Sequence, residues 1–306
     1  MNGSLVVFVP TLNPGAQWLD WVAALKSQSL VPDQVVVIDS GSEDSTCQIA
    51  ADAGFDVDSI DIASFNHGGT RQSVIDQYRD YDFVVYLTQD AILENADSLS
   101  ALMSFFMGKN VAAVCGRQLP RKNATHIESH ARLFNYPSVS NIRSISDKKK
   151  YGLKLAFLSN SFSAYRISAL NEVGGFPDNI IFGEDMYVAA KMLKAGYKIA
   201  YAADACVYHS HDYSIWQEMK RYFDMGVFHA REPWIRQEFG HAEGEGVKFV
   251  SSELKYLLRH AFWRIPEAVL RTIMKYTGFH LGLAEHYIPL KIKRIVSMNP
   301  RYFKTD

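Results

Sequence analysis

The sequence has few cysteines, and their spacing indicates neither a disulfide framework nor a zinc site. Only three of its 306 residues are cysteine, at positions 47, 115 and 206. An odd number at wide spacing matches neither the paired cysteines of small secreted domains nor the closely spaced ligands of structural zinc. We therefore expect a chain that folds in a reducing cytoplasm.

Long apolar runs, low-complexity tracts and internal repeats are also missing. No run approaches the length of about 18 residues that a membrane span needs, and no basic leader precedes the apolar residues 5–9. We expect neither secretion nor a spanning helix. A chain that is 48% apolar and 21% charged has the composition of a globular protein, long enough for one large domain or a domain with an appendage.

Charge is distributed unevenly, although the net charge is only −1. Residues 248–306 contain eleven Lys or Arg against four acids, a local balance of +7. Such a segment is either a solvated helical face or a surface for an anionic partner such as a phospholipid membrane. The sequence leaves both interpretations open.

Short β-branched runs alternate with helical patterns over residues 4–117. The expected strands are residues 5–9, 35–38, 83–87 and 111–114, and the expected helices are residues 18–27, 45–53, 69–77 and 96–107. This alternation predicts a parallel sheet with right-handed crossovers. Ligands of such sheets bind beyond the carboxyl ends of the strands, so the residues that follow each strand are candidates for a site.

Polar side chains follow three of these strands: Thr11 and Asn13 after the first, Asp39 after the second, and Thr88, Gln89 and Asp90 after the third. Asp39 suits the ring nitrogen or hydroxyl of a ligand, the alternative being a local turn. Asp90 is either a cap for the following helix or an oxygen ligand for a divalent cation.

The stretch FNHGGTR, residues 65–71, precedes a helix that we expect to begin near Thr70. Gly68 and Gly69 would let backbone N–H groups approach an anionic or planar ligand, and Arg71 would add a fixed charge. The alternative is an ordinary glycine turn with Arg71 on the surface.

Two further pairs carry chemistry. Glu184 and Asp185 begin a helical pattern, where the helix dipole alone would favour acids, but their side chains diverge by about 100°, so one can bond protein while the other faces a cleft. His209 and His211 follow an expected strand at residues 206–208 and would point to the same face, which suits a metal or a phosphate.

Taken together and in this order, these stretches resemble glycosyltransferase family 2, the inverting GT-A nucleotide-sugar transferases. The resemblance covers residues 4–212 and is carried by VPTLN (9–13), VIDSGSEDST (37–46), FNHGGTR (65–71), LTQDA (87–91), GGF (174–176) and FGED (182–185). The loop 65–71, TQD and HSHDYSIWQEMKRYFDMGVFH (209–229) resemble more narrowly the rhamnosyltransferases that build bacterial surface polysaccharides. The resemblance implies an α/β GT-A domain, Rossmann-like with a mostly parallel sheet, over residues 1–212 and a helical region over 213–306.

The resemblance also implies a role for each candidate residue. Asp185 matches the catalytic base, and Asp90 matches the last acid of the metal-binding DXD element, whose first acid is replaced here by Thr88. Thr88 or Gln89 would then contact the ribose, and His209 or His211 would complete the coordination of Mg2+ or Mn2+, with His209 favoured because it follows the strand directly. Thr11, Asp39 and Arg71 are implied around the base and ribose, with Glu184 supporting the acceptor or its loop. The remaining residues expected at the substrate are Asn13, Asn66, Gly68 and Gly69.

The implied reaction is the inverting transfer of one sugar per acceptor, L-rhamnose from dTDP-rhamnose, to a polyprenyl-diphosphate-linked glycan. The QxxRW signature of processive synthases is missing, because Gln217 and Arg221 are one residue too far apart. Most aromatic residues beyond 213 are expected to lie in the core or to pack against the sheet domain. The remainder, interleaved with basic residues, suit an interfacial helix at the anionic inner face of a bacterial plasma membrane. No nucleic-acid partner is expected.

Three alternatives compete with this interpretation. A nucleotidyltransferase typically carries a glycine-rich basic loop after its first strand, where this chain has Thr11-Leu12-Asn13-Pro14. A non-catalytic nucleotide-sugar or glycan-binding protein and a transferase with another sugar donor remain alternatives. The preferred interpretation requires Asp39, Asp90 and Asp185 to meet at one edge of the sheet.

Overall fold

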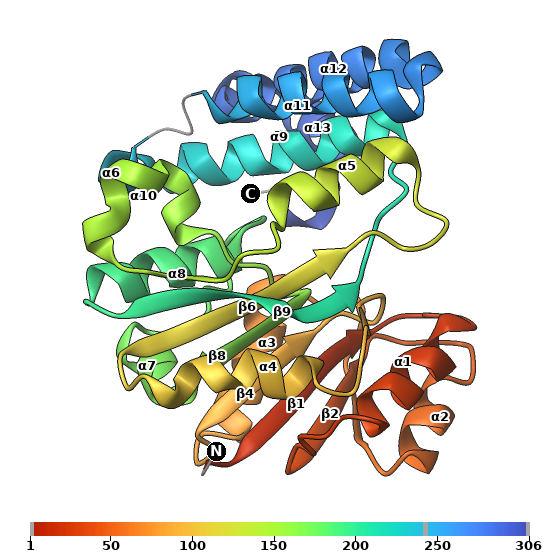
Figure 1. Cartoon of the computed structure of the whole chain (residues 1–306), viewed down its shortest axis with the longest axis vertical. Helices are drawn as coiled ribbons and strands as arrows, with labels where there is room; N and C mark the ends of the chain where they lie inside the picture. The colour runs from red at the N-terminus through yellow and green to blue at the C-terminus, as the bar shows by residue number, and fades with distance from the viewer. Residues whose placement is uncertain (1–2, 241–243, 304–306) are drawn as a thin grey trace.

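A nine-stranded mixed sheet forms the centre of the computed structural model, which describes residues 3–240 and 244–303 (Figure 1). Its strands follow the order β3-β2-β1-β4-β8-β6-β9-β5, and β7 pairs with β9. The strands are β1 Leu5–Thr11, β2 Gln34–Asp39, β3 Asp56–Ser59, β4 Phe83–Leu87, β5 Ile92–Leu93, β6 Val111–Leu119, β7 Asn141–Arg143, β8 Phe162–Arg166 and β9 Lys198–Tyr208.

The half of the sheet built from the first 87 residues is parallel, as the sequence predicts. β1 pairs in parallel with β2 and with β4, and β2 pairs in parallel with β3. Consecutive β1 residues face opposite sides of the sheet: Val7 and Val9 pack in one hydrophobic cluster, and Val6 and Phe8 pack in the other. Burial on both faces explains why these strands are continuous apolar runs in the sequence.

The other half departs from a parallel arrangement. β8 lies between β4 and β6 and is antiparallel to both, so that β6 is not the neighbour of β4. β8 enters the sheet after the excursion of residues 120–161 and therefore runs back from the edge where β4 and β6 end. The side-chain pattern of a strand does not encode its direction, which is why the sequence did not predict this insertion.

Helices cover both faces of the sheet. α1 Gln17–Lys26, α2 Thr46–Asp52 and α4 Ser98–Met103 pack in one cluster with β1 residues such as Val7, while α3 His67–Gln77, α7 Ile167–Glu172 and α8 Glu184–Lys194 pack in the cluster that contains Phe8. The remaining helices are α5 His126–Asn135, α6 Lys148–Tyr151, α9 Ile215–Arg231, α10 Pro233–Phe239, α11 Glu245–His260, α12 Ile265–Leu283 and α13 Leu290–Val296. Figure 1 shows α9, α11 and α12 as a layer above the sheet.

Two long helices of this layer, α9 and α12, touch backbone to backbone. A Cβ added at Gly278 would lie 2.3 Å from the carbonyl oxygen of Met219, and one added at Gly282 would lie 2.1 Å from that of Phe223. Phe223 and Phe228 of α9 belong to the same core cluster as the sheet. The helical layer is thereby fixed to the central sheet through α9. The domain boundary after residue 212 stays a prediction.

None of the described helices is both long and apolar enough to cross a membrane.

Candidate functional site

Side chains from several parts of the chain meet where β1, β2, β4, β6 and β9 end. The residues that precede β8 join them, because β8 runs in the opposite direction. Thr11 and Asp39 end neighbouring strands in register, and the Thr11 hydroxyl donates to Asp39 Oδ1 at 2.8 Å. Gln89 joins the same edge, since its Oε1 accepts from the backbone N–H of Leu12 at 2.7 Å.

The Asp39 carboxylate accepts hydrogen bonds from its own loop. It accepts from the N–H groups of Gly41 and Ser42, at 2.9 and 2.7 Å, and from the Ser42 hydroxyl at 2.6 Å. Burial would raise the pKa of Asp39, but these donors hold it below its usual range. The local turn that the sequence left open is therefore present, and a contact of Asp39 with a nucleotide stays a prediction.

Asn13 ties the first loop to the second. It has a positive φ of 44°, which asparagine tolerates, its N–H donates to the Ser42 hydroxyl at 2.8 Å and its Oδ1 accepts from the N–H of Glu43 at 2.8 Å. Thr88 differs, since its hydroxyl oxygen is buried without a hydrogen-bond partner among the described residues. Contacts of either residue with a substrate remain predictions.

The glycine-rich stretch lies inside a helix. α3 begins at His67, three residues before the expected start, because Asn66 caps it by accepting from the N–H of Gly69 at 2.5 Å. A Cβ on Gly68 would lie 1.7 Å from the carbonyl oxygen of Pro177. The expected start of the helix near Thr70 is therefore three residues too late, because Gly68 permits close packing and the Gly69 N–H donates to the Asn66 cap. Substrate contacts of Asn66, Gly68 and Gly69 remain predictions.

Arg71 and Glu184 form a buried ion pair, so the alternative of a surface Arg71 is wrong. Arg71 Nη1 lies 3.1 Å from Glu184 Oε1, and the two side chains are only 6% and 9% exposed. The same Nη1 donates to the carbonyl oxygen of His67 at 2.8 Å, and the Asn160 amide donates to Glu184 at 3.1 Å. Burial opposes ionisation of Glu184, but Arg71, His67 and Asn160 hold its pKa below its usual range. A contact of Arg71 with the nucleotide stays a prediction.

Asp185, the next residue after Glu184, is half-buried. Its Oδ2 accepts from the backbone N–H of Asn160 at 3.3 Å, and its Oδ1 accepts from the N–H of Met186 at 2.7 Å. Burial, together with the charge of neighbouring Glu184, raises the pKa of Asp185 to about 7. Of two adjacent carboxyl groups, one is thus an anchored anion and the other can exchange a proton near neutrality.

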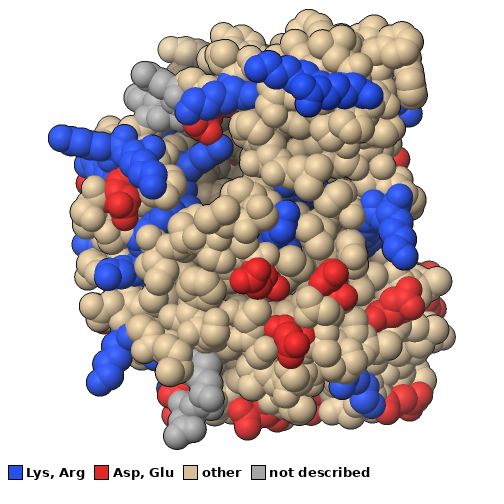
Figure 2. All heavy atoms as spheres, viewed as in Figure 1, with Lys and Arg blue, Asp and Glu red and all other residues tan. Residues whose placement is uncertain are grey.

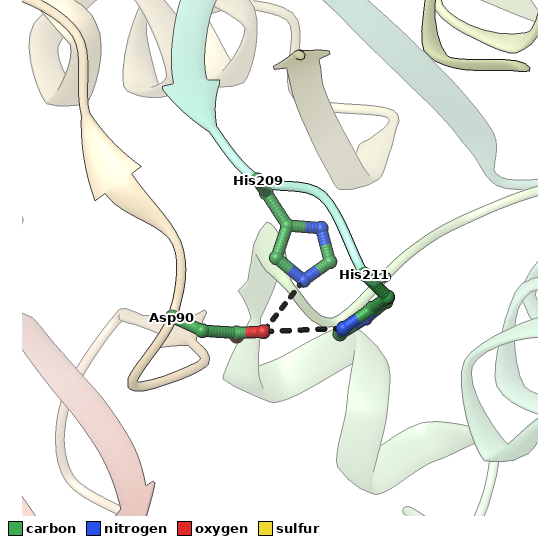
Figure 3. A group of neighbouring side chains, drawn as sticks. All are labelled: Asp90, His209 and His211. Carbon is green, nitrogen blue, oxygen red and sulfur yellow. Dashed lines mark ion pairs between the residues drawn. The ribbon is translucent and has the colours of Figure 1, made fainter. Parts of the chain in front are cut away.

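Asp90, His209 and His211 face one another (Figure 3). Asp90 Oδ2 lies 3.2 Å from His209 Nε2 and 3.4 Å from His211 Nδ1, and the three ligand atoms lie within 4.8 Å of one another. Burial lowers the pKa of both histidines, so they are neutral at pH 7, and the pKa of Asp90 lies below its usual range, so its carboxylate is ionised. Neutral imidazoles and an ionised carboxylate are the forms that bind metal.

Hydrogen bonds fix the tautomer of His209. Arg132 Nη1 can only donate and lies 2.5 Å from Gln118 Oε1, which is therefore an acceptor. His209 Nδ1 lies 2.8 Å from the same oxygen, so Nδ1 carries the proton and Nε2 presents a lone pair to Asp90. Nε2 is buried with no hydrogen-bond partner among the described residues. Two acceptors 3.2 Å apart repel each other unless a cation lies with them, so the donor set fits a divalent metal.

Hydrogen bonds, together with the peptide link between Ser159 and Asn160, connect this cluster to Asp185. Gln118, which accepts from His209, donates through Nε2 to the Ser159 hydroxyl at 2.9 Å, and the next residue, Asn160, contacts both Glu184 and Asp185. The sequence missed Gln118 because the expected strand ended at residue 114 instead of 119. It missed Asn160 because nothing in the sequence signalled β8.

We expect loss of the Arg71–Glu184 pair to destabilise the protein strongly. Arg71→Met leaves a carboxylate buried without its counter-charge, which costs about 3–5 kcal/mol. Urea unfolding at pH 7 measures this, and adding Glu184→Gln should recover part of the loss. Lys148→Met, which breaks the exposed pair with Glu238, is the matched control and should change little. If Arg71→Met and Lys148→Met lowered the free energy of unfolding equally, Arg71 and Glu184 would not form a stabilising buried pair.

Comparisons with known proteins show the family of the chain. The family model described as "Glycosyltransferase like family 2" matches residues 3–223. The chain is 47% identical to the O-antigen chain rhamnosyltransferase RfbN of Salmonella typhimurium and 48% identical to the O-antigen chain rhamnosyltransferase WbaN of Salmonella anatum, covering 98% of this chain and 96% of each relative.

Solved structures of low sequence identity share the fold. A mannosyltransferase from Pyrobaculum calidifontis, in complex with GDP-Man and Mn2+, is 17% identical with a TM-score of 0.58, over 99% of this chain and 85% of that one. Residues 1–349 of S. aureus TarS, in complex with UDP-GlcNAc, give the same identity and TM-score over 97% of this chain and 84% of that one. With the family model spanning most of the chain and two relatives matching nearly all of it, the protein belongs to glycosyltransferase family 2.

Proposed function

We propose that the protein transfers L-rhamnose from dTDP-rhamnose, with inversion, to a hydroxyl of a polyprenyl-diphosphate-linked glycan in bacterial O-antigen synthesis. The observation that carries this proposal is the meeting of Asp185 with the Asp90–His209–His211 cluster at one sheet edge. The donor is proposed because two O-antigen chain rhamnosyltransferases are nearly half identical along almost the whole chain.

Asp185 acts as the general base. Its carboxylate accepts the proton of the acceptor hydroxyl while that oxygen attacks the anomeric carbon on the face opposite the diphosphate. The bond from the anomeric carbon to the diphosphate breaks, its electron pair stays on the phosphate oxygen, and the configuration inverts. Glu184, held by Arg71, keeps the pKa of Asp185 in the range where a base is effective.

Asp90, His209 and His211 would hold the divalent metal, which supplies charge stabilisation for the departing diphosphate. Of the two candidate ions, Mn2+ suits this set better than Mg2+, because Mg2+ strongly prefers oxygen ligands and two of the three donors are imidazole nitrogens. Gln118 orients the His209 ring for this task through the hydrogen bond at Nδ1.

Asp185→Asn should lower kcat by about 10²- to 10⁴-fold while the nucleotide sugar still binds. A base works only when deprotonated, so wild-type kcat/KM should fall as the pH drops through about 7. Glu184→Gln removes the neighbouring negative charge, so the fall of kcat/KM should occur at lower pH. Initial rates across a pH series measure both effects, and wild-type turnover by Asp185→Asn would reject the base.

Mn2+ binding tests the metal cluster without any dependence on turnover. His209→Ala or His211→Ala should weaken Mn2+ binding by at least about tenfold, measured from the electron paramagnetic resonance signal of the free ion in the presence of a nucleoside diphosphate. His286→Ala, an exposed histidine elsewhere, serves as the control. Retained affinity in both cluster variants would rule out this cluster as the metal site.

The C-terminal helices offer a surface for the membrane that carries a lipid-linked acceptor. The C-terminal apolar surface consists of exposed residues of α11, α12 and the turn between them: Leu258, Phe262, Trp263, Val269, Leu270, Ile273 and Tyr276. Exposed basic residues accompany it on this region: Lys248, Lys255, Arg259, Lys291, Arg294 and Arg301. Within residues 244–303, none of the four acids is exposed.

The distribution of charge over the molecule supports the same orientation. Figure 2 shows Lys and Arg across the upper part, where Figure 1 has α11 and α12, while Asp and Glu gather over the lower half. Apolar side chains that enter the headgroup region, accompanied by cations, are typical of proteins that lie on an anionic bilayer. We therefore propose a peripheral position at the cytoplasmic face of the plasma membrane.

Vesicle flotation tests this surface. The protein should float with vesicles that contain anionic phospholipid and much less with zwitterionic ones, and Phe262→Ser with Trp263→Ser should abolish flotation because these side chains are 66% and 63% exposed. Val31→Ser with Met107→Ser removes two exposed apolar side chains from the sheet domain and is the matched control. Flotation that survives the first pair of changes would refute the surface.

A further inference from the structure

Arg221 lies on α9 between the two parts of the site. Its Cζ is 5.0 Å from the centre of the Phe182 ring and 5.9 Å from that of Tyr213. Phe182 stands three residues before Asp185, and Tyr213 stacks on His211 with ring centres 4.8 Å apart. The guanidinium is thus held between the segment that carries the base and the segment that carries the metal cluster.

This guanidinium has no anionic partner. Within residues 3–240 and 244–303, Arg221 donates no hydrogen bond and has no carboxylate oxygen within 4.0 Å. The positive charge of Arg221 contributes to lowering the pKa of His67, His211 and Arg132. The groups around it therefore include two imidazole rings and a second guanidinium. Stacking on two aromatic rings fixes the position of a guanidinium but leaves its N–H donors free.

The surroundings carry an excess of positive charge. Arg132 donates to Gln118 and Arg121 donates to the carbonyl oxygen of Asp90, so neither is paired with a carboxylate. Glu184 is already balanced by Arg71, which leaves the carboxylates of Asp90 and Asp185, the latter partly protonated near pH 7, against the guanidinium groups of Arg121, Arg132 and Arg221. Cations gathered without counter-charge at a strand edge favour a ligand with several negative charges.

We propose that Arg221, supported by Arg132, binds the diphosphate of the nucleotide sugar and stabilises the nucleoside diphosphate as it leaves. This inference rests on the proposed function. As the bond to the anomeric carbon breaks, its electron pair remains on the terminal phosphate, and the planar guanidinium can donate two N–H groups to oxygens of that phosphate without transferring a proton. It gives α9, which lies outside residues 1–212, a direct part in the reaction.

Comparing nucleoside diphosphate with monophosphate isolates this contact. Calorimetry with Mn2+ first identifies which of the thymidine, uridine and guanosine diphosphates the wild type binds best. Arg221→Gln should then weaken the affinity for that diphosphate by about 10- to 100-fold, the range of a charge-assisted hydrogen bond. The affinity for the matching monophosphate should stay nearly unchanged. Arg221→Lys should restore part of the affinity and of kcat. Lys220→Gln, which removes the adjacent charge on the same helix, is the control and should change neither.

The outcomes separate the inference from the proposed function. A wild type that binds none of the three diphosphates would overturn both. A wild type that prefers the diphosphate, with a preference that Arg221→Gln retains in full, would overturn the role of Arg221 alone. Equal weakening of both nucleotides would also overturn it, because a purely structural stacking role predicts that pattern. Arg221→Lys keeps the charge and the stem, so it gives a readable result even if Arg221→Gln folds poorly.

Discussion

The buried pair between Arg71 and Glu184 is the interaction on which the site depends. A carboxylate at the start of α8 can remain ionised below the surface only with a counter-charge, and Arg71 brings one from α3, more than a hundred residues earlier in the chain. Burial, together with the negative charge that Glu184 keeps, raises the pKa of its neighbour Asp185 above that of an ordinary aspartate. One ion pair therefore positions the N-terminus of α8, joins α3 to it and adjusts the proton affinity of the proposed base.

The cluster of Asp90, His209 and His211 also depends on contacts between distant segments of the chain. Gln118 cannot move freely, because Arg132 and Ser159 both hold its amide, and this fixes which nitrogen of His209 faces Asp90. Ser159 adjoins Asn160, which contacts Glu184 and Asp185, so the cluster and the proposed base share one supporting segment. The antiparallel β8 is what brings this segment to the edge where the parallel strands end.

The helical layer packs on the sheet and contributes a residue to the site. α9 is anchored in the core of the sheet by Phe223 and Phe228, and it contacts α12 so closely that glycine is needed on both sides. One side of this layer carries the C-terminal apolar surface, and the other presents Arg221 between Phe182 and Tyr213. In the proposed function, α11 and α12 would meet the lipid-linked acceptor and α9 would meet the sugar donor.

The sequence by itself determined the parallel half of the sheet, because apolar periodicity is a local signal, and its motifs resembled the family that the comparisons then showed. The roles of Asp90, His209 and Asp185 remain predictions. The sequence placed Asp39 and Asn13 at the right edge but left open that they are satisfied within their loops. Only the tertiary structure decided the pairing of Arg71 with Glu184, the direction of β8 and the arrival of Gln118, Asn160 and Arg221 at the site. Those features are contacts between segments far apart in the chain. The local sequence around a strand does not specify its direction, and the local sequence around a charged residue does not specify its partner.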